Sequence, residues 1–220
     1  MPEPAQDPGS WADLAFVVRS VAQTAVDNER EFGELDAVVG DGDFGYSLAR
    51  GFEVVLSGWD DFDRSSPAVF LRKIALVISQ RVGGTSGPLW GTAALRAAGA
   101  SGAADNGADA VAMLRAAAEG IKARGKAELG DKTLLDALIP MTDAIEERLA
   151  RTDAPAADGA ELARVAADTA RAAADATTPL QARRGRASYT GERSIGSPDA
   201  GAVAVAVMAE RIADTWKDRG

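Results

Sequence analysis

Apolar residues recur along most of this chain at the spacing that one face of a helix requires. Near the N-terminus this spacing is seen at Leu14, Ala15, Val18, Ala22 and Ala25. Ser10 and Asp13 resemble a capping box at the start of the stretch. The pattern therefore predicts a first amphipathic helix from about Trp11 to Arg30.

Seven further helices are predicted from the same periodicity and from residues that cap helix ends. Their expected limits are Tyr46 to Leu56, Pro67 to about Gly83, Ser86 to Ala98, Asp109 to Lys122, the Asp131–Thr133 cap to beyond Ile145, Asp158 or Gly159 to Ala176, and Pro198 to about Trp216. Pro140 is expected to kink the sixth of these eight helices. No hairpin turn separates alternating β-branched runs, so the sequence predicts an all-α fold without strands.

Three segments lack this periodicity. Residues 1–10 are acidic and rich in proline, and we expect a disordered N-terminal segment there, followed by one helical domain at 11–220. Residues 150–157 form a polar connection between helices that are too similar to mark a domain boundary. Residues 178–197, called the arginine loop below, have a length that is typical of functional or disordered segments. This loop carries Arg183, Arg184, Arg186, Arg193 and one acid, Glu192.

Composition narrows the possible chemistry. The 24 basic and 33 acidic residues give a net charge of −9, which argues against nonspecific binding to nucleic acid or anionic membranes. Without cysteine or histidine, the chain has no thiol and no imidazole to serve as nucleophile, metal ligand, base or phosphoryl carrier. The N-terminus does not resemble a signal peptide, and the longest apolar run, 200–209, has about half the length of a membrane span. We therefore expect a cytoplasmic protein.

Three aspartates stand close together in one glycine-rich segment. Asp36 precedes Asp41 and Asp43, which belong to the sequence Gly-Asp-Gly-Asp. Three anions at such spacing repel one another unless a cation lies among them. Hard oxygen ligands on a flexible turn suit Mg²⁺. A solvated turn is the simpler alternative, because Asp and Gly are common turn residues.

Two further glycine-rich segments join predicted helices. Residues 83–88 combine backbone N–H groups with a helix start, an arrangement that binds anions. Ser86 could cap this helix or donate to a phosphate. Residues 125–133 form a second glycine-bracketed helix entry. An ordinary turn explains each segment when it is taken alone, and the sequence has no Walker-type GxxxxGK[ST] motif.

Taken together, four blocks of sequence resemble the L subunit of dihydroxyacetone kinase. The blocks are Leu35–Asp36 with Gly40–Asp43, Gly83–Thr92, Gly125–Thr133 and Gly185–Gly196. Their order and spacing match from about Trp11 to the end of the chain. The resemblance implies an antiparallel eight-helix barrel that binds ADP or ATP at one end, with two Mg²⁺ ions between acidic residues and phosphates.

The resemblance also implies roles for individual residues. Asp36, Asp41 and Asp43 would ligate Mg²⁺ and, with Arg186, form the catalytic group. The nucleotide would contact Phe44, Gly45, Tyr46, Ser47, Thr85, Ser86, Gly125, Leu134, Arg186, Asp199, Ala200 and Gly201. One position departs from the family, which usually has His where this chain has Phe44, so a side chain able to hydrogen-bond phosphate is replaced by one that cannot.

By the same resemblance, the chain would be the nucleotide-binding, phosphoryl-transferring subunit of a kinase for dihydroxyacetone or a related short ketose such as erythrulose. In that family a separate K subunit holds the sugar through a His, which this chain lacks. An alternative is a carrier whose bound ADP is rephosphorylated by a phosphocarrier protein and which also contacts a transcriptional regulator. We expect Arg186 to contact the nucleotide and the arginine loop to close over it, unless that loop is a solvated or partner-docking surface.

Overall fold

A computed structural model describes residues 8–101, 110–153 and 155–219. Within these residues the secondary structure is helical and contains no strand, as predicted. The α-helices are α1 (Pro8–Asp27), α2 (Glu29–Ala37), α3 (Phe44–Ser57), α4 (Pro67–Arg81), α5 (Ser86–Ala100), α6 (Ala110–Gly125), α7 (Leu135–Ala150), α8 (Gly159–Asp175) and α9 (Ala200–Thr215). Three 3-10 helices are η1 (Trp59–Asp61), η2 (Arg186–Ser194) and η3 (Trp216–Asp218).

Local capping explains several helix starts that the sequence predicted. Ser66 accepts a hydrogen bond from the backbone N–H of Val69, and Pro67 occupies the first turn of α4. Asp158 caps α8 in the same way. These side chains satisfy backbone donors that a helix N-terminus leaves unpaired, so the starts of α4 and α8 can be read from local sequence.

The N-terminal region differs from the prediction in two respects. Helix α1 begins at Pro8, inside the segment 1–10 that was expected to be disordered, and residues 1–7 lie outside the described residues. The predicted helix 11–30 is interrupted at Asn28, whose side-chain amide donates to the backbone oxygen of Thr24. The chain then continues as α2, which the sequence analysis missed. The described residues therefore contain nine α-helices instead of eight.

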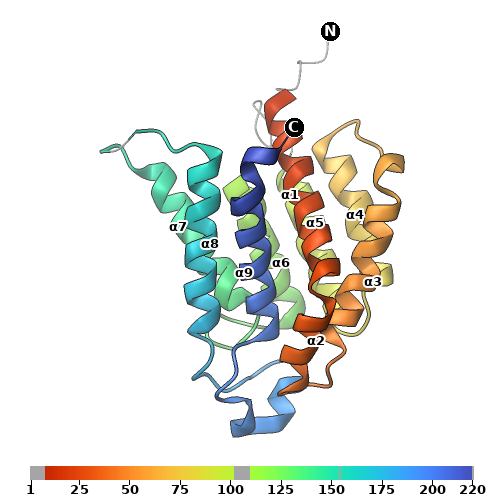
Figure 1. Ribbon diagram of the computed structural model, residues 1–220, viewed down its shortest axis with the longest axis vertical. Helices are drawn as coiled ribbons and strands as arrows, with labels where there is room; N and C mark the ends of the chain where they lie inside the picture. Colours follow the sequence, from red (N-terminus) through yellow and green to blue (C-terminus); the bar gives the residue numbers. More distant parts are fainter. Residues whose placement is uncertain (1–7, 102–109, 154, 220) are drawn as a thin grey trace.

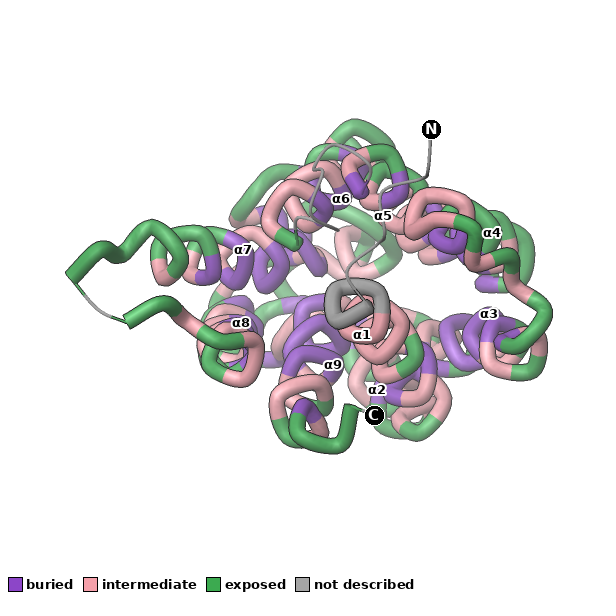
Figure 2. Tube along the Cα trace, turned by 90° about the horizontal axis from the view of Figure 1, so that it is seen from above, coloured by how far each residue is buried: buried purple, intermediate pink, exposed green. Residues whose placement is uncertain are grey.

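Eight of the helices pack in a closed order. Helix α1 packs against α3, each helix from α3 to α8 packs against the next one in the chain, and α9 packs against α1. Helix α2 contacts α3 and α9. Figure 2 shows this arrangement from above. The closed order is consistent with the eight-helix barrel that the resemblance implied. In Figure 1 the loops 38–43, 82–85, 126–134 and the arginine loop all lie at the lower end, called the site end below.

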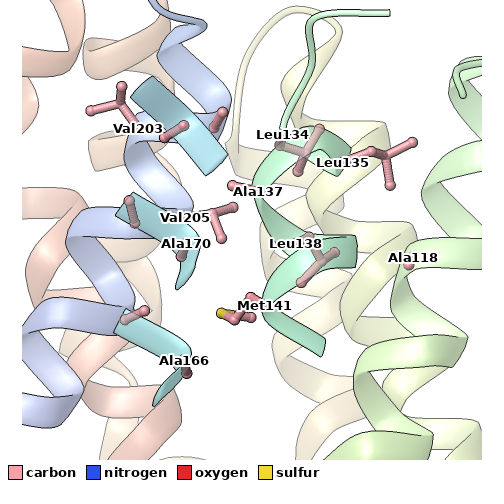
Figure 3. Close-up of a cluster of buried hydrophobic side chains, with 14 of the residues drawn as sticks. Ala118, Leu134, Leu135, Ala137, Leu138, Met141, Ala166, Ala170, Val203 and Val205 are labelled. Carbon is pink, nitrogen blue, oxygen red and sulfur yellow. The ribbon is translucent and has the colours of Figure 1, made fainter. Parts of the chain in front are cut away.

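Two apolar clusters hold this ring together. The first joins α7, α8 and α9 through small side chains such as Ala170 and Ala206, which are fully buried and let the helices approach closely (Figure 3). The second is richer in aromatic residues and includes Phe32, Phe52 and Phe70. Burying such rings supplies most of the favourable energy of packing. Because Phe32 lies on α2, this second cluster also fixes the helix that carries Asp36.

Candidate functional site

The three predicted carboxylates come together at the site end. Asp36 lies near the end of α2, Asp41 in the following turn, and Asp43 directly before α3. Each offers one carboxylate oxygen, and these oxygens lie within 4.8 Å of one another. A β-carbon at Gly40 would lie 2.3 Å from the carboxylate oxygen Oδ1 of Asp36, so the absence of a side chain at Gly40 lets Asp36 face the turn. We call these three residues the acidic cluster.

The arginine loop supplies a cation to this cluster. The guanidinium of Arg186 forms an ion pair with Asp41, and its second terminal nitrogen lies 3.4 Å from Asp43. The backbone N–H of Phe44 lies 3.4 Å from Asp36. Carboxylate oxygens on a glycine-containing turn, partly open to solvent, are a donor set that fits Mg²⁺. The guanidinium of Arg186 offsets part of the repulsion among the three anions, because it lies against two of them.

A pocket of about 350 Å³ opens beside the acidic cluster. Its walls come from the start of α5, the end of α6, the 126–134 loop and the arginine loop. The lining residues are Thr85, Pro88, Leu89, Ile121, Arg124, Gly125, Ala127, Thr133, Leu134, Arg184 and Gly185. Apolar side chains with a few polar groups and arginines at the edge are typical of a pocket for a flat, partly apolar ligand that carries a charged group.

Two chain segments connect the pocket to the acidic cluster. In the arginine loop, Gly185 lines the pocket and the next residue, Arg186, pairs with the aspartates. In the 82–85 loop, Gly83 approaches α3 so closely that a β-carbon there would lie 2.8 Å from the hydroxyl oxygen of Ser47. Thr85, two residues later, lines the pocket. A ligand that fills the pocket and extends along the arginine loop therefore reaches Arg186 and its partner aspartates, and one that extends along the 82–85 loop reaches Ser47 on α3.

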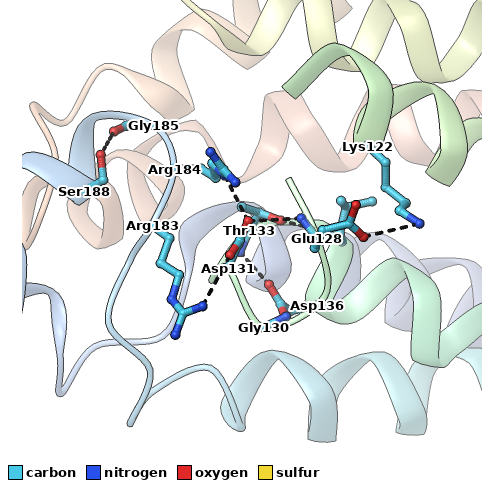
Figure 4. Close-up of polar contacts among 11 residues, drawn as sticks. Lys122, Glu128, Gly130, Asp131, Thr133, Asp136, Arg183, Arg184, Gly185 and Ser188 are labelled. Carbon is cyan, nitrogen blue, oxygen red and sulfur yellow. Dashed lines mark hydrogen bonds and ion pairs between the residues drawn. The ribbon is translucent and has the colours of Figure 1, made fainter. Parts of the chain in front are cut away.

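A buried polar network supports the pocket from behind. The carboxylate of Asp136 accepts hydrogen bonds from the backbone N–H groups of Gly130 at 2.5 Å and Thr133 at 2.7 Å. The carboxylate of Asp131 accepts from Nε of Arg184 at 2.9 Å (Figure 4). Burial acts to raise the pKa of Asp131, but hydrogen bonds from Arg184 and the Glu128 backbone, together with nearby guanidinium charge, lower it overall. Asp131 therefore stays ionised and anchors Arg184 at the pocket.

Comparison with known proteins identifies the family. A model described as the DAK2 domain matches residues 38–214. The chain belongs to the DAK2 domain family. The L-erythrulose 1-kinase of Mycolicibacterium smegmatis is 38% identical over 210 residues, which are 92% of this chain but 35% of that protein. The ADP-binding subunit DhaL of the PEP-dependent dihydroxyacetone kinase of Escherichia coli is 37% identical, over 84% of this chain and 87% of that subunit.

Solved structures agree with this assignment. The native dihydroxyacetone kinase of C. freundii superimposes with a TM-score of 0.73 and 25% identity, over 98% of this chain and 36% of that chain. The DAK2 domain described here thus spans about a third of the longer relatives and most of the separate subunits. No helix in the described part of the chain combines the length and apolarity that a membrane span requires.

The DAK2 fold brings some of the predicted nucleotide-binding residues to the pocket and leaves others beside it. Thr85, Gly125 and Leu134 line the pocket. Ser86 is the first residue of α5 and follows Thr85. The residues 199–201 lie behind the lining residue Leu134, because a β-carbon at Gly201 would lie 3.2 Å from that of Leu134. Asp199 caps α9 through the backbone N–H of Ala202, and Ala200 begins that helix.

The predicted nucleotide-binding residues at the start of α3 do not line the pocket. The ring of Phe44 packs on Phe32 of the core, with ring centroids 6.1 Å apart, so it serves the contact between α2 and α3. Gly45 is buried where α2 and α3 approach each other. Tyr46 is exposed beneath the guanidinium of Arg50. The sequence analysis did not name the other lining residues as individual contacts, which are Pro88, Leu89, Ile121, Arg124, Ala127, Thr133, Arg184 and Gly185. Of these, Arg184 was signalled by the excess of positive charge in the arginine loop.

The environment of Asp199 raises the pKa of its carboxyl group well above the ordinary value. The residue is partly exposed, but its carboxyl group faces inward, and burial raises its pKa to about 7. The neighbouring carboxylate of Asp136 acts in the same direction, whereas Lys132 and the backbone N–H groups of Ala202 and Gly201 oppose the shift. Ionising this group therefore costs folding free energy at neutral pH.

We expect the free energy of unfolding to fall as the pH rises from about 4 to 8, relative to Asp199→Asn. The carboxyl group has a pKa of 3.8 in the unfolded chain and of about 7 in the folded protein. Unfolding therefore releases a proton at any pH between these two values. Asn removes this titration and remains a good N-cap residue. The difference in free energy of unfolding between the two proteins should change by roughly 4 kcal/mol between pH 4 and pH 8. Urea unfolding at several pH values measures it, and a pH-independent difference would contradict the assignment.

Proposed function

We propose that this DAK2 domain chain is the nucleotide-binding, phosphoryl-transferring subunit of a short-chain ketose kinase. The observation that carries the proposal is the acidic cluster, joined through Arg186 and Gly185 to an apolar pocket. Two relatives are named an ADP-binding subunit of a dihydroxyacetone kinase and an L-erythrulose 1-kinase. A crystal structure of the C. freundii kinase with AMP-PNP and Mg²⁺ has the same fold, with a TM-score of 0.72.

In this proposal the pocket walls, including Leu89 and Leu134, enclose the adenine, and the phosphates extend toward the acidic cluster. Asp36, Asp41 and Asp43 would hold two Mg²⁺ ions, whose charge would neutralise that of the phosphates. The N-terminus of α5, with Thr85 and Ser86 as further donors, faces anionic oxygens favourably because helix N–H groups are unpaired there. Positioning and electrostatic stabilisation by these groups supply the rate, and no covalent step on this chain is required.

We also propose a separate sugar-binding K subunit as partner. The chain contains no histidine, so it cannot hold a ketose through an imidazole. Several large apolar side chains are exposed within the segments that build the site. They are Val38, Tyr46, Leu129, Tyr189 and Ile195. Exposed apolar groups gathered around a polar site are typical of a docking surface.

Replacing Tyr189 should weaken K-subunit binding without weakening nucleotide binding. The side chain is 89% exposed in the arginine loop, so its burial at an interface would contribute favourable energy that Tyr189→Ser removes. We expect the dissociation constant of the complex to rise about tenfold or more. Leu149→Ser is the control, because Leu149 is 52% exposed at the end of α7 away from the site end. Equal effects of the two variants in a binding assay would contradict the docking surface.

The proposed function is tested by calorimetry and by reconstitution. ADP should bind the purified chain in Mg²⁺ and lose most of its affinity in a chelator, because phosphates and carboxylates repel without the metal. The chain alone should not phosphorylate dihydroxyacetone or erythrulose, and activity should appear when a K subunit is added. Equal ADP affinity in chelator, or turnover by the isolated chain, would contradict the proposal.

A carrier mechanism is the second candidate. Relatives in E. coli and Lactococcus lactis are named PEP-dependent and PTS-dependent ADP-binding subunits. In such a carrier ADP stays bound and is rephosphorylated by a phosphocarrier protein, and a transcriptional regulator could dock on the same surface. Release of ADP on a timescale much slower than turnover would favour the carrier, and rapid exchange with ATP would favour the kinase.

A further inference from the structure

Lys132 is buried in the wall behind the pocket, with 2% of its surface exposed. Its ammonium nitrogen donates hydrogen bonds to three backbone oxygens, those of Leu180 at 2.9 Å, Ser194 at 2.5 Å and Ser197 at 2.7 Å. All three acceptors belong to the arginine loop. An ammonium group has three N–H donors, so this arrangement satisfies each of them.

The three acceptors lie at the two ends of the loop. Leu180 stands near its beginning, and Ser194 and Ser197 stand near its end, so one ammonium group ties both ends together. The backbone N–H of Ala182 reinforces the closure by donating to the hydroxyl of Ser194 at 2.9 Å. Residues 183–193 between these ties carry Arg184 and Arg186.

The segment that presents Lys132 is itself held in an unusual conformation. Lys132 has a backbone φ of 63°, a value that residues other than glycine rarely adopt. The carboxylate of Asp136 fixes the turn by accepting from the N–H groups on both sides, at Gly130 and Thr133. The backbone oxygen of Asp131 also accepts from the N–H of Arg183 at 3.0 Å, directly beside the lysine. The turn and the loop are thus joined at several points.

Placing an ammonium group here carries an energetic cost. Burial lowers the pKa of Lys132, and the charge of Asp199 opposes that shift only in part. No carboxylate among the described residues lies within ion-pair distance of Lys132. Buried charges are costly unless their hydrogen bonds are complete, and backbone oxygens at the two ends of the arginine loop complete those of Lys132. The ammonium group and the loop therefore hold each other in place.

We propose that Lys132 is a positioning residue that fixes the arginine loop, so that Gly185 forms a pocket wall and Arg186 faces Asp41 and Asp43. The effect on nucleotide rests on the proposed function, whereas the effect on the loop does not. Lys132 touches neither the pocket lining nor the acidic cluster through a described hydrogen bond. It acts through the loop alone.

The test compares Lys132→Met with Lys126→Met. Met keeps the length of the side chain and removes its donors and charge. Lys126 is a matched control, because it lies in the same 126–134 loop and also has a positive φ, 50°, but its side chain is exposed. Lys132→Gln retains two N–H donors, so its effects should be intermediate between those of Lys132→Met and the wild type. It replaces Lys132→Met in the test if the Met variant does not fold.

The first measurement is hydrogen exchange of the free protein without nucleotide. In Lys132→Met, the amides of residues 180–197 should exchange at least about tenfold faster than in the wild type, while the exchange rates in α7 and α9 stay unchanged. Lys126→Met should exchange like the wild type throughout. Unchanged loop exchange would overturn the proposal. Faster exchange spread equally over α7 and α9 would also overturn it, because that pattern marks a general loss of stability.

The second measurement is a double-mutant cycle on ADP affinity in Mg²⁺. Lys132→Met should weaken ADP binding about tenfold in the wild-type background and clearly less in Arg186→Ala, because the loop then lacks the one guanidinium that it places against Asp41 and Asp43. Additive losses would overturn the proposal. If the wild-type chain binds no ADP, the proposed function fails, while the exchange experiment still decides whether Lys132 holds the loop.

Discussion

The double substitution Asp41→Asn and Asp43→Asn should abolish Mg²⁺-dependent ADP binding, with the affinity falling about 100-fold or more. Both carboxylates belong to the acidic cluster, whose oxygens lie within 4.8 Å of one another. Asn has nearly the same shape as Asp but no negative charge, so the metal loses its charged ligands while the turn keeps its side-chain volumes. Titration calorimetry with ADP in Mg²⁺ measures the loss.

Asp60→Asn with Asp61→Asn is the matched control. These residues form an adjacent acidic pair in η1, between α3 and α4, at the end of the molecule away from the site end. The double change removes the same amount of charge as the test substitution. A control that binds ADP normally assigns the loss to the acidic cluster. An unchanged dissociation constant in the Asp41 and Asp43 variant would show that the aspartates do not hold the metal.

Gly45→Ala should destabilise the fold and weaken nucleotide binding together. A β-carbon at Gly45 would lie 1.9 Å from the backbone oxygen of Glu29 and 2.6 Å from the backbone nitrogen of Gly33, so α2 and α3 would have to separate. Overpacking against backbone costs roughly 1–3 kcal/mol or more. Because Asp36 lies on α2 and Asp43 directly precedes α3, the same movement should spread the acidic cluster. Urea unfolding and calorimetry measure the two effects.

Gly99→Ala tests whether this effect is specific to the helix contact. Gly99 is also a helical glycine, in α5, but a β-carbon there would meet nothing within 4 Å. Replacing an exposed helical glycine by alanine generally stabilises a protein by about 0.5–1 kcal/mol. The two glycine variants should therefore change stability in opposite directions. A loss of stability in Gly99→Ala similar to that in Gly45→Ala would contradict the packing argument.

The parts of the fold that sequence predicted well are those set by neighbouring residues. Ser66 with Pro67 and Asp158 cap their helices through contacts within three residues, so their positions are visible in the chain itself. Helix α2 was missed because it carries acids and a glycine and buries Phe32 alone among its residues. Its amphipathic pattern is too short to recognise, and contacts with α3 and α9 stabilise it.

The same distinction applies to the site. The acidic cluster was predicted because its three residues are close in sequence. The excess of positive charge pointed to the arginine loop as a whole, and the family resemblance singled out Arg186 within it. The structure confirms that these segments meet, since Arg186 pairs with Asp41. The pocket walls and Lys132 could not be found in this way, because Leu89, Ile121 and Arg184 come from distant segments that only the closed ring brings together.

The position of the C-terminus has a practical consequence for binding measurements. Arg219 stacks on Trp216, 4.4 Å from its ring centroid, and its Nε lies 2.5 Å from a carboxylate oxygen of Asp13 on α1, so the last described residues are held at the end opposite the site end. Helix α9 has 16 residues and separates the two ends by about 24 Å. A chain captured on a sensor surface through a C-terminal tag therefore presents the acidic cluster to the solution, so that binding of ADP and of the proposed K subunit can both be measured.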